Sequence, residues 1–351
     1  MNIVGVDVGT MFLVVAKHIA ETEKVEFNTM RNVFLPVSGS SINFSEIVDT
    51  KIDYIKSVDD NGNDQIYIIS EDAYKFSNIF NYAVRRPMSK GVVSSSEIDA
   101  VDIISMMIEK LVGGRTKDGY CVYSVPERAI DVESSPVLYH EKVFGKIFDN
   151  LGYKSSPLNE SMAIIYSECK DYNFNGIAIS FGSGLTNVVC AYRGTPVLKF
   201  SVSRAGDWVD KCVADSLGII PNRVTSIKEK PDFDLLGASL GKNKKEKRIV
   251  EAINFYYMEL IEYVLNVIIK KFNENSQGFE IDETIPIIVS GGTSKPKGFI
   301  SIFNDIFDRT KDFPYEVSHI IASKDPLNSV AMGCLLYALW EHKKLKKGIN
   351  S

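Results

Sequence analysis

The sequence has little of what builds metal clusters, nucleic-acid surfaces or membrane spans. Its five cysteines are widely scattered, and no two have the spacing of zinc ligands. The net charge is −5 at pH 7, so no basic field draws in nucleic acid and no direct nucleic-acid binding is expected. No stretch approaches the roughly 18 apolar residues that cross a bilayer, so no membrane span is expected.

No signal peptide is expected either, because the first residues read directly as a strand. Together with the odd number of cysteines, this is typical of a reducing cytoplasm. Dense basic runs are short and occur only at Lys242–Arg248 and Lys343–Lys347. We interpret them as a solvated helix face and a frayed tail, and contact with an acidic surface is the alternative.

The remaining composition is that of a globular protein. Of 351 residues, 45% are hydrophobic and 24% charged, which is enough apolar material to bury a large core. The length fits one large domain or two of moderate size.

Two segments of the chain share one form. Residues 3–17 and residues 176–192 each read as an apolar strand, a small glycine-bearing turn and a second apolar strand. The turns are short enough for β-hairpins, unlike the strand–turn–helix of a dinucleotide-binding fingerprint. The pattern therefore predicts one unit present twice, with each copy opening one half of the molecule.

Hydrophobic periodicity predicts the other elements of an α/β protein. The longest apolar stripe lies on a helix over 248–274, and core packing is favoured there over a coiled coil or an interaction helix. Residues 222–246 are polar and irregular, so an insertion is expected. The other expected strands lie near 24–36, 65–69, 120–125 and 285–290, and the other helices near 97–112, 132–150, 159–169, 207–217, 297–309 and 326–344.

The two hairpin turns have the chemistry of a phosphate site. Glycine turns present backbone N–H groups with no side chain in the way, and small hydroxyls add donors. Asp7, at the mouth of the first hairpin, can hold water molecules on Mg²⁺, which takes few protein ligands. Glycines kept only for tight turns are the alternative. The candidate donors are Gly9 and Thr10 in the first turn, and Gly182, Ser183, Gly184 and Thr186 in the second.

A third segment, Ile287–Ser294, carries the pair Gly291 and Gly292 before a predicted helix. Such a pair lets the backbone lie close to a flat base or an α-phosphate, and a helix N-terminus favours anions. With this segment, the set of residues resembles the actin superfamily. That superfamily includes actin, the bacterial rod-shape actin, plasmid-segregating actins, heat-shock chaperone ATPase domains and sugar kinases.

Five signature segments of the superfamily match in order over nearly the whole chain. Two further stretches, 86–93 and 205–210, resemble the bacterial rod-shape actin. The chain therefore looks closest to prokaryotic or viral actin-like filament proteins. The phosphate segments resemble 3–17 and 176–190, the connecting segments 159–163 and 325–333, and the adenosine segment 287–293.

The resemblance implies two actin-like, ribonuclease H-like halves, each a mixed sheet with flanking helices, and a nucleotide cleft between them. The first half is expected over 1–158 plus 326–351, with an insertion near 33–85. The second is expected over 159–325, with an insertion near 219–247.

The resemblance also implies ATP or ADP with Mg²⁺ as the ligand. Asp7 is expected to hold the metal through water and to serve in catalysis, and Glu160 matches the water-orienting glutamate of bacterial members. For Glu160, a helix-start carboxylate favoured by the helix dipole is the alternative. Lys228 and Glu229 resemble the actin lysine and glutamate that hold adenosine, with an ordinary charged helix turn as the alternative. The expected nucleotide contacts are Gly9, Thr10, Met11, Gly182, Ser183, Gly184, Leu185, Thr186, Lys228, Glu229, Gly291, Gly292 and Thr293.

Two positions depart from the family pattern. Ser180 stands where relatives usually carry an acidic residue that arranges water, and Met11 stands where several carry a small residue. These departures put the rate of ATP hydrolysis in question more than nucleotide binding. A weak ATPase is expected.

The resemblance favours a cytoplasmic, nucleotide-dependent filament with a cytoskeletal, segregation or positioning role. It is expected to associate with itself and with an unidentified protein or adaptor. The alternatives are a chaperone-like binding module with little turnover and, less favoured, a sugar or small-molecule kinase. Against a kinase, the N-terminal half offers no clear catalytic aspartate.

Overall fold

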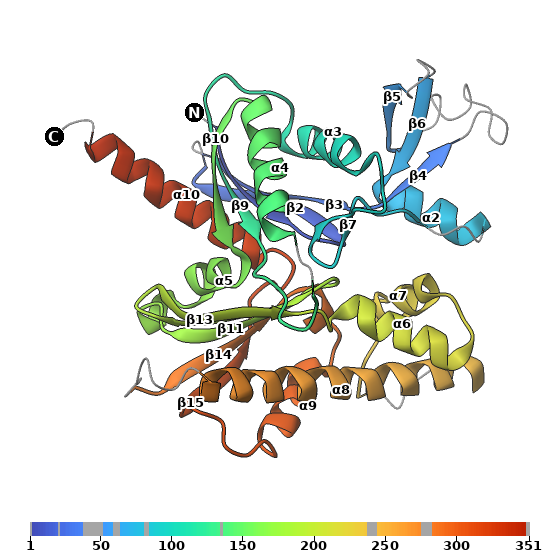
Figure 1. Cartoon of the computed structure of the whole chain (residues 1–351), viewed down its shortest axis with the longest axis vertical. Helices are drawn as coiled ribbons and strands as arrows, with labels where there is room; N and C mark the ends of the chain where they lie inside the picture. The colour runs from blue at the N-terminus through green and yellow to red at the C-terminus, as the bar shows by residue number, and fades with distance from the viewer. Residues whose placement is uncertain are drawn as a thin grey trace.

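Two five-stranded sheets lie one above the other, with helices between them and on their outer faces (Figure 1). The structure is a computed structural model, and it describes residues 2–19, 22–37, 52–58, 64–80, 84–133, 136–236, 244–274 and 283–348.

The first sheet begins with three antiparallel strands that are joined by short turns, β1, β2 and β3. Two later strands then add beside β1, parallel to it, because each follows a helical crossover. All seven residues of β9 are buried, as expected of a central parallel strand. The order is β10 (Tyr153–Asn159), β9 (Gly119–Val125), β1 (Asn2–Val8), β2 (Phe12–Ile19) and β3 (Lys24–Arg31).

The second sheet repeats this plan. Strands β11, β12 and β13 are antiparallel neighbours, and β14 and β15 add in parallel beside β11. Strand directions in the two sheets therefore correspond one to one, as the two similar sequence segments predict. The order is β13 (Thr195–Val202), β12 (Thr186–Tyr192), β11 (Gly176–Phe181), β14 (Ile285–Ser290) and β15 (Val317–Ala322).

Helices α5 (Glu160–Glu168) and α10 (Ser329–Gly348) lie between the sheets. Their apolar residues share one buried cluster with strands of both sheets. Backbones touch here: a Cβ on Gly333 would stand 1.8 Å from the Ala163 carbonyl oxygen, and one on Gly5 would stand 2.1 Å from the Leu335 nitrogen. Only glycine fits at such contacts, so these two connecting helices hold the halves in close register.

The outer faces are covered by amphipathic helices. Helices α3 (Ala100–Val112) and α4 (Val137–Asn150) pack on the first sheet. The second sheet is covered by α6 (Gly206–Leu217), α8 (Lys244–Glu274) and α9 (Phe299–Phe307).

The sequence led us to expect no membrane span, and helix α8 bears on this expectation. In the described part of the chain, its segment Glu246–Glu274 is the one helix that is long and apolar enough to cross a bilayer. Its stripe from Ile249 to Phe272 is buried in the core of the second half, as predicted. Core helices of soluble proteins meet the same criterion, so it is weak support for a span.

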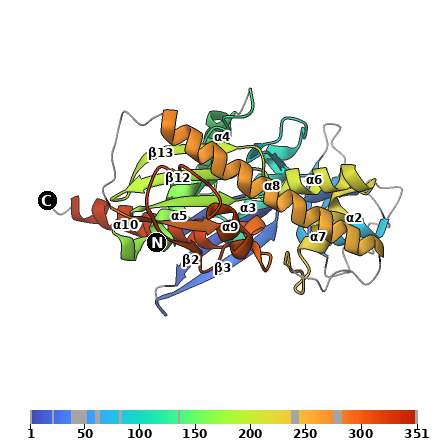
Figure 2. The same cartoon turned by 90° about the horizontal axis from the view of Figure 1, so that it is seen from below.

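Smaller elements extend each half on one side (Figures 1 and 2). A three-stranded sheet with α2 belongs to the first half, and the short α7 belongs to the second. The hairpin β7–β8 lies near the junction. The elements are β4 (Phe34–Val37), β5 (Tyr54–Val58), β6 (Asp64–Ile69), α2 (Ser70–Phe80), β7 (Met88–Ser89), β8 (Val92–Val93), α7 (Pro221–Lys228) and two 3₁₀ turns, η1 (Lys170–Tyr172) and η2 (Gly292–Ser294).

The predicted fold class is confirmed, with local corrections. The expected irregular region 222–246 is wrong at both ends, because residues 221–228 form α7 and α8 begins at Lys244. Val224 and Ile227 anchor α7 in the core. The predicted strand 24–36 is two strands in different sheets, which a break at Asn32 and Val33 separates. Parts of the expected insertions, including residues 38–51 and 237–243, lie outside the described residues.

Candidate functional site

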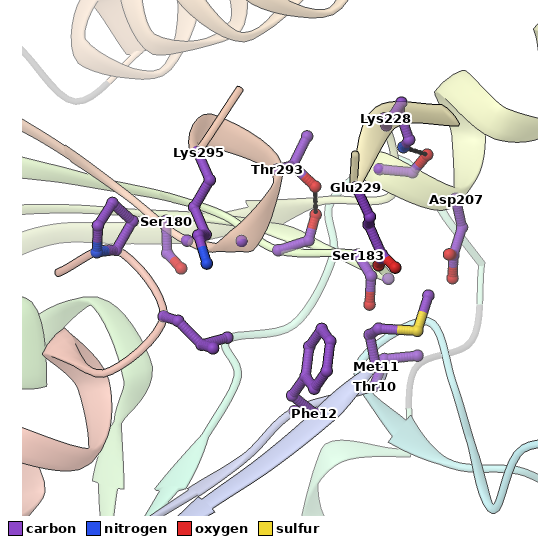
Figure 3. Close-up of a pocket in the computed structure, with 18 of the residues that line it drawn as sticks. Thr10, Met11, Phe12, Ser180, Ser183, Asp207, Lys228, Glu229, Thr293 and Lys295 are labelled. Carbon is purple, nitrogen blue, oxygen red and sulfur yellow. Dashed lines mark hydrogen bonds between the residues drawn. The ribbon is translucent and has the colours of Figure 1, made fainter. Parts of the chain in front are cut away.

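A cavity of about 650 Å³ opens between the two halves, where the hairpins of both sheets end. Its walls come from the first-half turn after β1, the second-half turn after β11, helix α7 and the segment after β14 (Figure 3). Thr10, Met11 and Phe12 reach into it from one side, and Ser183, Glu229, Thr293 and Lys295 lie across from them.

The two turns that line this cavity are built alike. In the first, the Gly9 N–H donates to the Phe12 carbonyl at 3.1 Å; in the second, the Gly182 N–H donates to the Leu185 carbonyl at 3.0 Å. A Cβ on Gly9 or Gly182 would stand 2.5 or 2.7 Å from the same acceptor oxygen. Glycine is therefore needed to close each turn, and the residues of both turns line the cavity.

The turns also touch each other across the cleft. A Cβ on Gly184 would stand 2.5 Å from the Thr10 hydroxyl and 2.9 Å from the Gly91 nitrogen. The Gly91 N–H, at the tip of the β7–β8 hairpin, donates to the Thr10 hydroxyl at 3.0 Å. Turns more than 170 positions apart in sequence, at Thr10 and Gly184, thus form one continuous wall.

Helix α6 begins directly behind the second turn. The Asp207 N–H donates to the Ser183 carbonyl at 2.8 Å, and the Gly206 N–H donates to the Gly182 carbonyl at 3.0 Å. Thr293 donates to that Gly182 carbonyl from the other side, at 2.7 Å. The turn is fixed from three directions, and the positive end of the α6 dipole lies beside it.

Two carboxylates lie deep in the cavity. Asp7, near the end of β1, accepts from the Ser124 hydroxyl at 2.8 Å. Glu160, the first residue of α5, accepts from Ser180 at 2.8 Å and from the Asn187 side-chain amide at 2.9 Å. Asn187 is itself held by Ser201, which donates to its side-chain oxygen. Both oxygens of Glu160 are therefore oriented, and Ser180 supplies one of the two donors.

The surroundings disfavour negative charge on this pair. Burial raises the pKa of Asp7 to about 6, although the hydrogen bond from Ser124 opposes the shift. Burial and the nearby charge of Asp7 raise the pKa of Glu160 to about 8, against the hydrogen bond from Ser180. Carboxyls in this state gain from a cation between or beside them.

The far end of the cavity holds a buried ion pair. Lys228 Nζ lies 2.6 Å from Asp210, and Thr225 donates to the other Asp210 oxygen at 2.7 Å. Burial opposes the charge of Lys228, but Asp210 outweighs it and raises the pKa of the lysine. The Tyr257 ring lies 5.8 Å from the ammonium. Lys228 is therefore positively charged and held in place, and the negative charge of Asp210 balances it.

Glu229 is tied to the opposite half by Arg31. The guanidinium at the end of β3 donates to Glu229 through two nitrogens, at 3.1 and 2.7 Å, and to Glu71 at 2.6 Å. Its carbon lies 4.6 Å from the Phe12 ring centroid and 4.4 Å from that of Tyr74. The Arg31 side chain is only 6% exposed. We call this group the Arg31 clamp.

Other contacts close the same side of the cleft. Arg86 donates to both oxygens of Asp207, at 2.9 and 2.8 Å. The Tyr74 hydroxyl donates to the Asn222 carbonyl at 3.1 Å and lies 3.1 Å from the Ser226 hydroxyl. Each contact joins the first half to α6 or α7.

The segment after β14 forms the remaining wall. Gly291 has a φ of 92°, and a Cβ there would stand 2.4 Å from the Phe181 carbonyl oxygen. Gly292 has no atom within 4 Å of its Cβ position and is open to the cavity. Lys295 points into the cavity from the same segment (Figure 3).

The structure brings together all the predicted site residues except one. Thr186 does not line the cavity, because it is fully buried and its hydroxyl donates to the Arg204 carbonyl at 2.8 Å. Sequence reasoning missed several lining residues, notably Arg31, Asn187 and Lys295. Among the described residues, no cluster of three or more His, Cys, Asp or Glu side chains could hold a metal ion.

Comparison with known proteins identifies the family and the fold. None of the curated proteins matches this chain in sequence. The MreB5 of Spiroplasma citri bound to AMPPNP superposes with a TM-score of 0.67 at 13% identity, over 99% of this chain and 98% of that one. MamK in its double helical filament gives 0.67 at 17% identity, over 96% and 98%.

A third structure, the ethanolamine utilization protein EutJ from Carboxydothermus hydrogenoformans, gives a TM-score of 0.55 at 17% identity, over 95% of this chain and 89% of that one. At such identities the likeness shows the fold, which is that of the actin superfamily. The model of the Volactin family matches residues 1–338. The chain therefore belongs to the Volactin family and has the two-halved, actin-like α/β fold.

Proposed function

We propose that this protein binds ATP, with Mg²⁺, in the cavity between its halves. The observation that carries the proposal is the convergence of two equivalent glycine turns, at 9–12 and 182–185, on one cavity. Backbone N–H groups from both sides, with the hydroxyls of Thr10 and Ser183, suit a polyphosphate that spans the cleft. Structures of similar fold support the ligand class: MreB5 of Spiroplasma citri was solved with AMPPNP and with ADP.

The nucleoside is assigned to the other end of the cavity. There Lys228, Glu229 and the open backbone at Gly292 line one space. Because Asp210 already neutralises Lys228, that end is less cationic than its residue types suggest. A neutral base with a ribose fits such a wall.

The residues around Asp7 fit a magnesium ion that is held through water. Asp7 and Glu160 are the carboxylates at this end. Their raised pKa values mean that a nearby cation would stabilise their ionised forms. Mg²⁺ usually keeps several waters and few protein ligands. When bound, it supplies charge neutralisation for the phosphates.

Hydrolysis is assigned to Glu160, with Asp7 in support. Ser180 and Asn187 hold both Glu160 oxygens, so the carboxylate is fixed to orient a water molecule for attack. Ser180 brings no charge of its own. We therefore expect slow turnover.

We further propose that the protein assembles into nucleotide-dependent filaments in the cytoplasm. Support comes from MamK, solved as a double helical filament, which matches nearly the full length of this chain. Halves over 1–158 plus 326–351 and over 159–325 would move about α5 and α10 as the ligand changes. Partners beyond a second copy, such as an adaptor protein, stay a prediction.

A nucleotide-regulated binding module with little turnover is the second candidate. The replacement of an acidic residue by Ser180 favours it, because this change weakens hydrolysis more than binding. A small-molecule kinase is less favoured, because the N-terminal half offers no clear candidate for a catalytic aspartate.

The test compares Asp7→Ala with Asp118→Ala, which removes an exposed carboxylate before β9. We expect Asp7→Ala to abolish Mg²⁺-dependent ATP binding and Asp118→Ala to leave it unchanged. Equal affinity for Mg·ATP in both variants would rule out the site. Negative-stain microscopy with ATP and with ADP then separates a filament from a binding module.

A further inference from the structure

The C-terminal end of α10 projects beyond the first sheet in both views (Figures 1 and 2). Three large apolar side chains are exposed along it: Leu336 at 36%, Trp340 at 50% and Leu345 at 43%. Trp340 is thus half exposed, one helical turn after the exposed Leu336.

Cations lie beside the apolar residues. Leu336, Trp340 and Lys344 recur every fourth residue, so they share one face of the helix. The Lys344 ammonium lies 3.6 Å from the Trp340 ring centroid, and Lys343 is exposed next to it. Two more lysines follow in the sequence, at positions 346 and 347. We call Leu336, Trp340, Lys343 and Lys344 the α10 face.

One acidic residue lies beside the α10 face on the same helix, and its carboxylate is engaged elsewhere. Glu341 is the one acidic residue from 329 onward, and it accepts from Tyr120 at 2.5 Å and from Ser156 at 3.1 Å, toward the sheet.

We propose that the α10 face binds the surface of an anionic lipid bilayer. Tryptophan prefers the headgroup level, where its ring is apolar on one side and wet on the other, and lysines beside it gain from acidic headgroups. A fluid interface needs no matched pocket, so a convex face with flexible cations suits it better than it suits a folded partner. This inference does not depend on nucleotide binding.

The attachment is expected to be weak and sensitive to salt. One helix end buries few apolar groups, and charge attraction falls off within a Debye length. A single copy should bind reversibly, and linked copies should bind more tightly through their combined contacts.

The test uses the full chain and vesicles of two compositions, phosphatidylcholine alone and phosphatidylcholine with phosphatidylserine. Trp208 is the other tryptophan, so Trp208→Phe leaves Trp340 as the sole reporter. We expect the mixed vesicles to carry the protein down on sedimentation and to shift Trp340 emission to shorter wavelength. Vesicles of phosphatidylcholine alone should do neither.

Paired charge reversals locate the face. Lys343→Glu with Lys344→Glu should lower the partition coefficient at least about tenfold, because each lysine contributes to the attraction. The matched control, Lys247→Glu with Arg248→Glu, reverses two exposed cations at the start of α8 and should change it less than about twofold. Trp340→Ser should weaken binding without lowering the melting temperature.

Three outcomes would overturn the proposal. They are equal binding to both vesicle types, equal loss in the two double variants, and no vesicle binding by the unmodified chain. If the α10 variants instead change only the oligomeric state, the face is a contact between copies and not a lipid site.

Discussion

The Arg31 clamp gives the most specific prediction about how the halves are held together. Replacing Arg31 by Met keeps an apolar chain between Phe12 and Tyr74 but removes the guanidinium. Three charge-assisted hydrogen bonds are lost, and two of them go to Glu229 across the cleft. The closed arrangement should therefore weaken more than either half by itself.

The magnitude follows from the exposure of the partners. Removing one member of a fully buried ion pair costs about 3–5 kcal/mol, whereas an exposed pair is worth at most about 1. Arg31 is 6% exposed, but Glu229 and Glu71 are 35% and 51% exposed and can regain water. We expect a loss of about 2 kcal/mol, with roughly 1.4 kcal/mol of it across the cleft, equivalent to a tenfold loss of affinity for Mg·ATP.

Affinity is measured with a fluorescent ATP analogue, and the free energy of unfolding by urea titration. Arg85→Met is the matched control, because Arg85 stacks on Phe34 at 4.9 Å and pairs with Glu97, both within the first half. It should lower stability but leave nucleotide affinity unchanged.

A double-mutant cycle with Glu229→Gln isolates the contact. We expect a coupling energy of about 1–2 kcal/mol between Arg31 and Glu229. A coupling near zero, or an equal affinity loss in Arg31→Met and Arg85→Met, would refute the clamp.

Three further predictions concern titratable groups. Glu160→Gln should lower phosphate release at least about 100-fold while ATP affinity changes little, and an equal loss of both would contradict its catalytic assignment. Because the pKa of Asp7 is raised, this group stabilises the folded protein below about pH 4, and the stabilisation is lost as the pH rises through about 6. In urea unfolding of the ligand-free protein, Asp7→Asn should remove this pH-dependent loss of stability. His140 is fully buried with both ring nitrogens unpaired, and burial lowers its pKa to about 4. The free energy of unfolding should therefore fall by up to about 3 kcal/mol as the pH drops from 6.5 through 4. His140→Leu should abolish this loss, and an unchanged dependence of stability on acid pH would show that another group causes it.

The sequence was informative where the structure depends on neighbouring residues. Each glycine turn closes within four residues, through Gly9 to Phe12 or Gly182 to Leu185, so its glycines and flanking apolar strands suffice to predict it. The segments 159–163 and 325–333, matched by resemblance to the connecting segments, contain Ala163 and Gly333, which the structure brings into contact.

The sequence alone did not predict features that depend on contacts between residues far apart in the chain. Arg31 contacts residues 71 and 229, and no local pattern marks it as a cavity residue. Strand β10 carries Lys154, Ser155, Ser156 and Pro157 and has no apolar run; it is a strand because it pairs along its whole length with β9. Helix α7 had a signal, Pro221 at its start, but its polar surface concealed the buried Val224 and Ile227.

Hydrogen exchange at the two turns tests the central claim most directly. If one polyphosphate is gripped from both sides, Mg·ATP should slow exchange of the amides at 10–12 and 183–185 together, with one shared concentration midpoint, and AMP should slow neither. Protection of a single turn, or two different midpoints, would contradict the claim that both halves hold the same ligand.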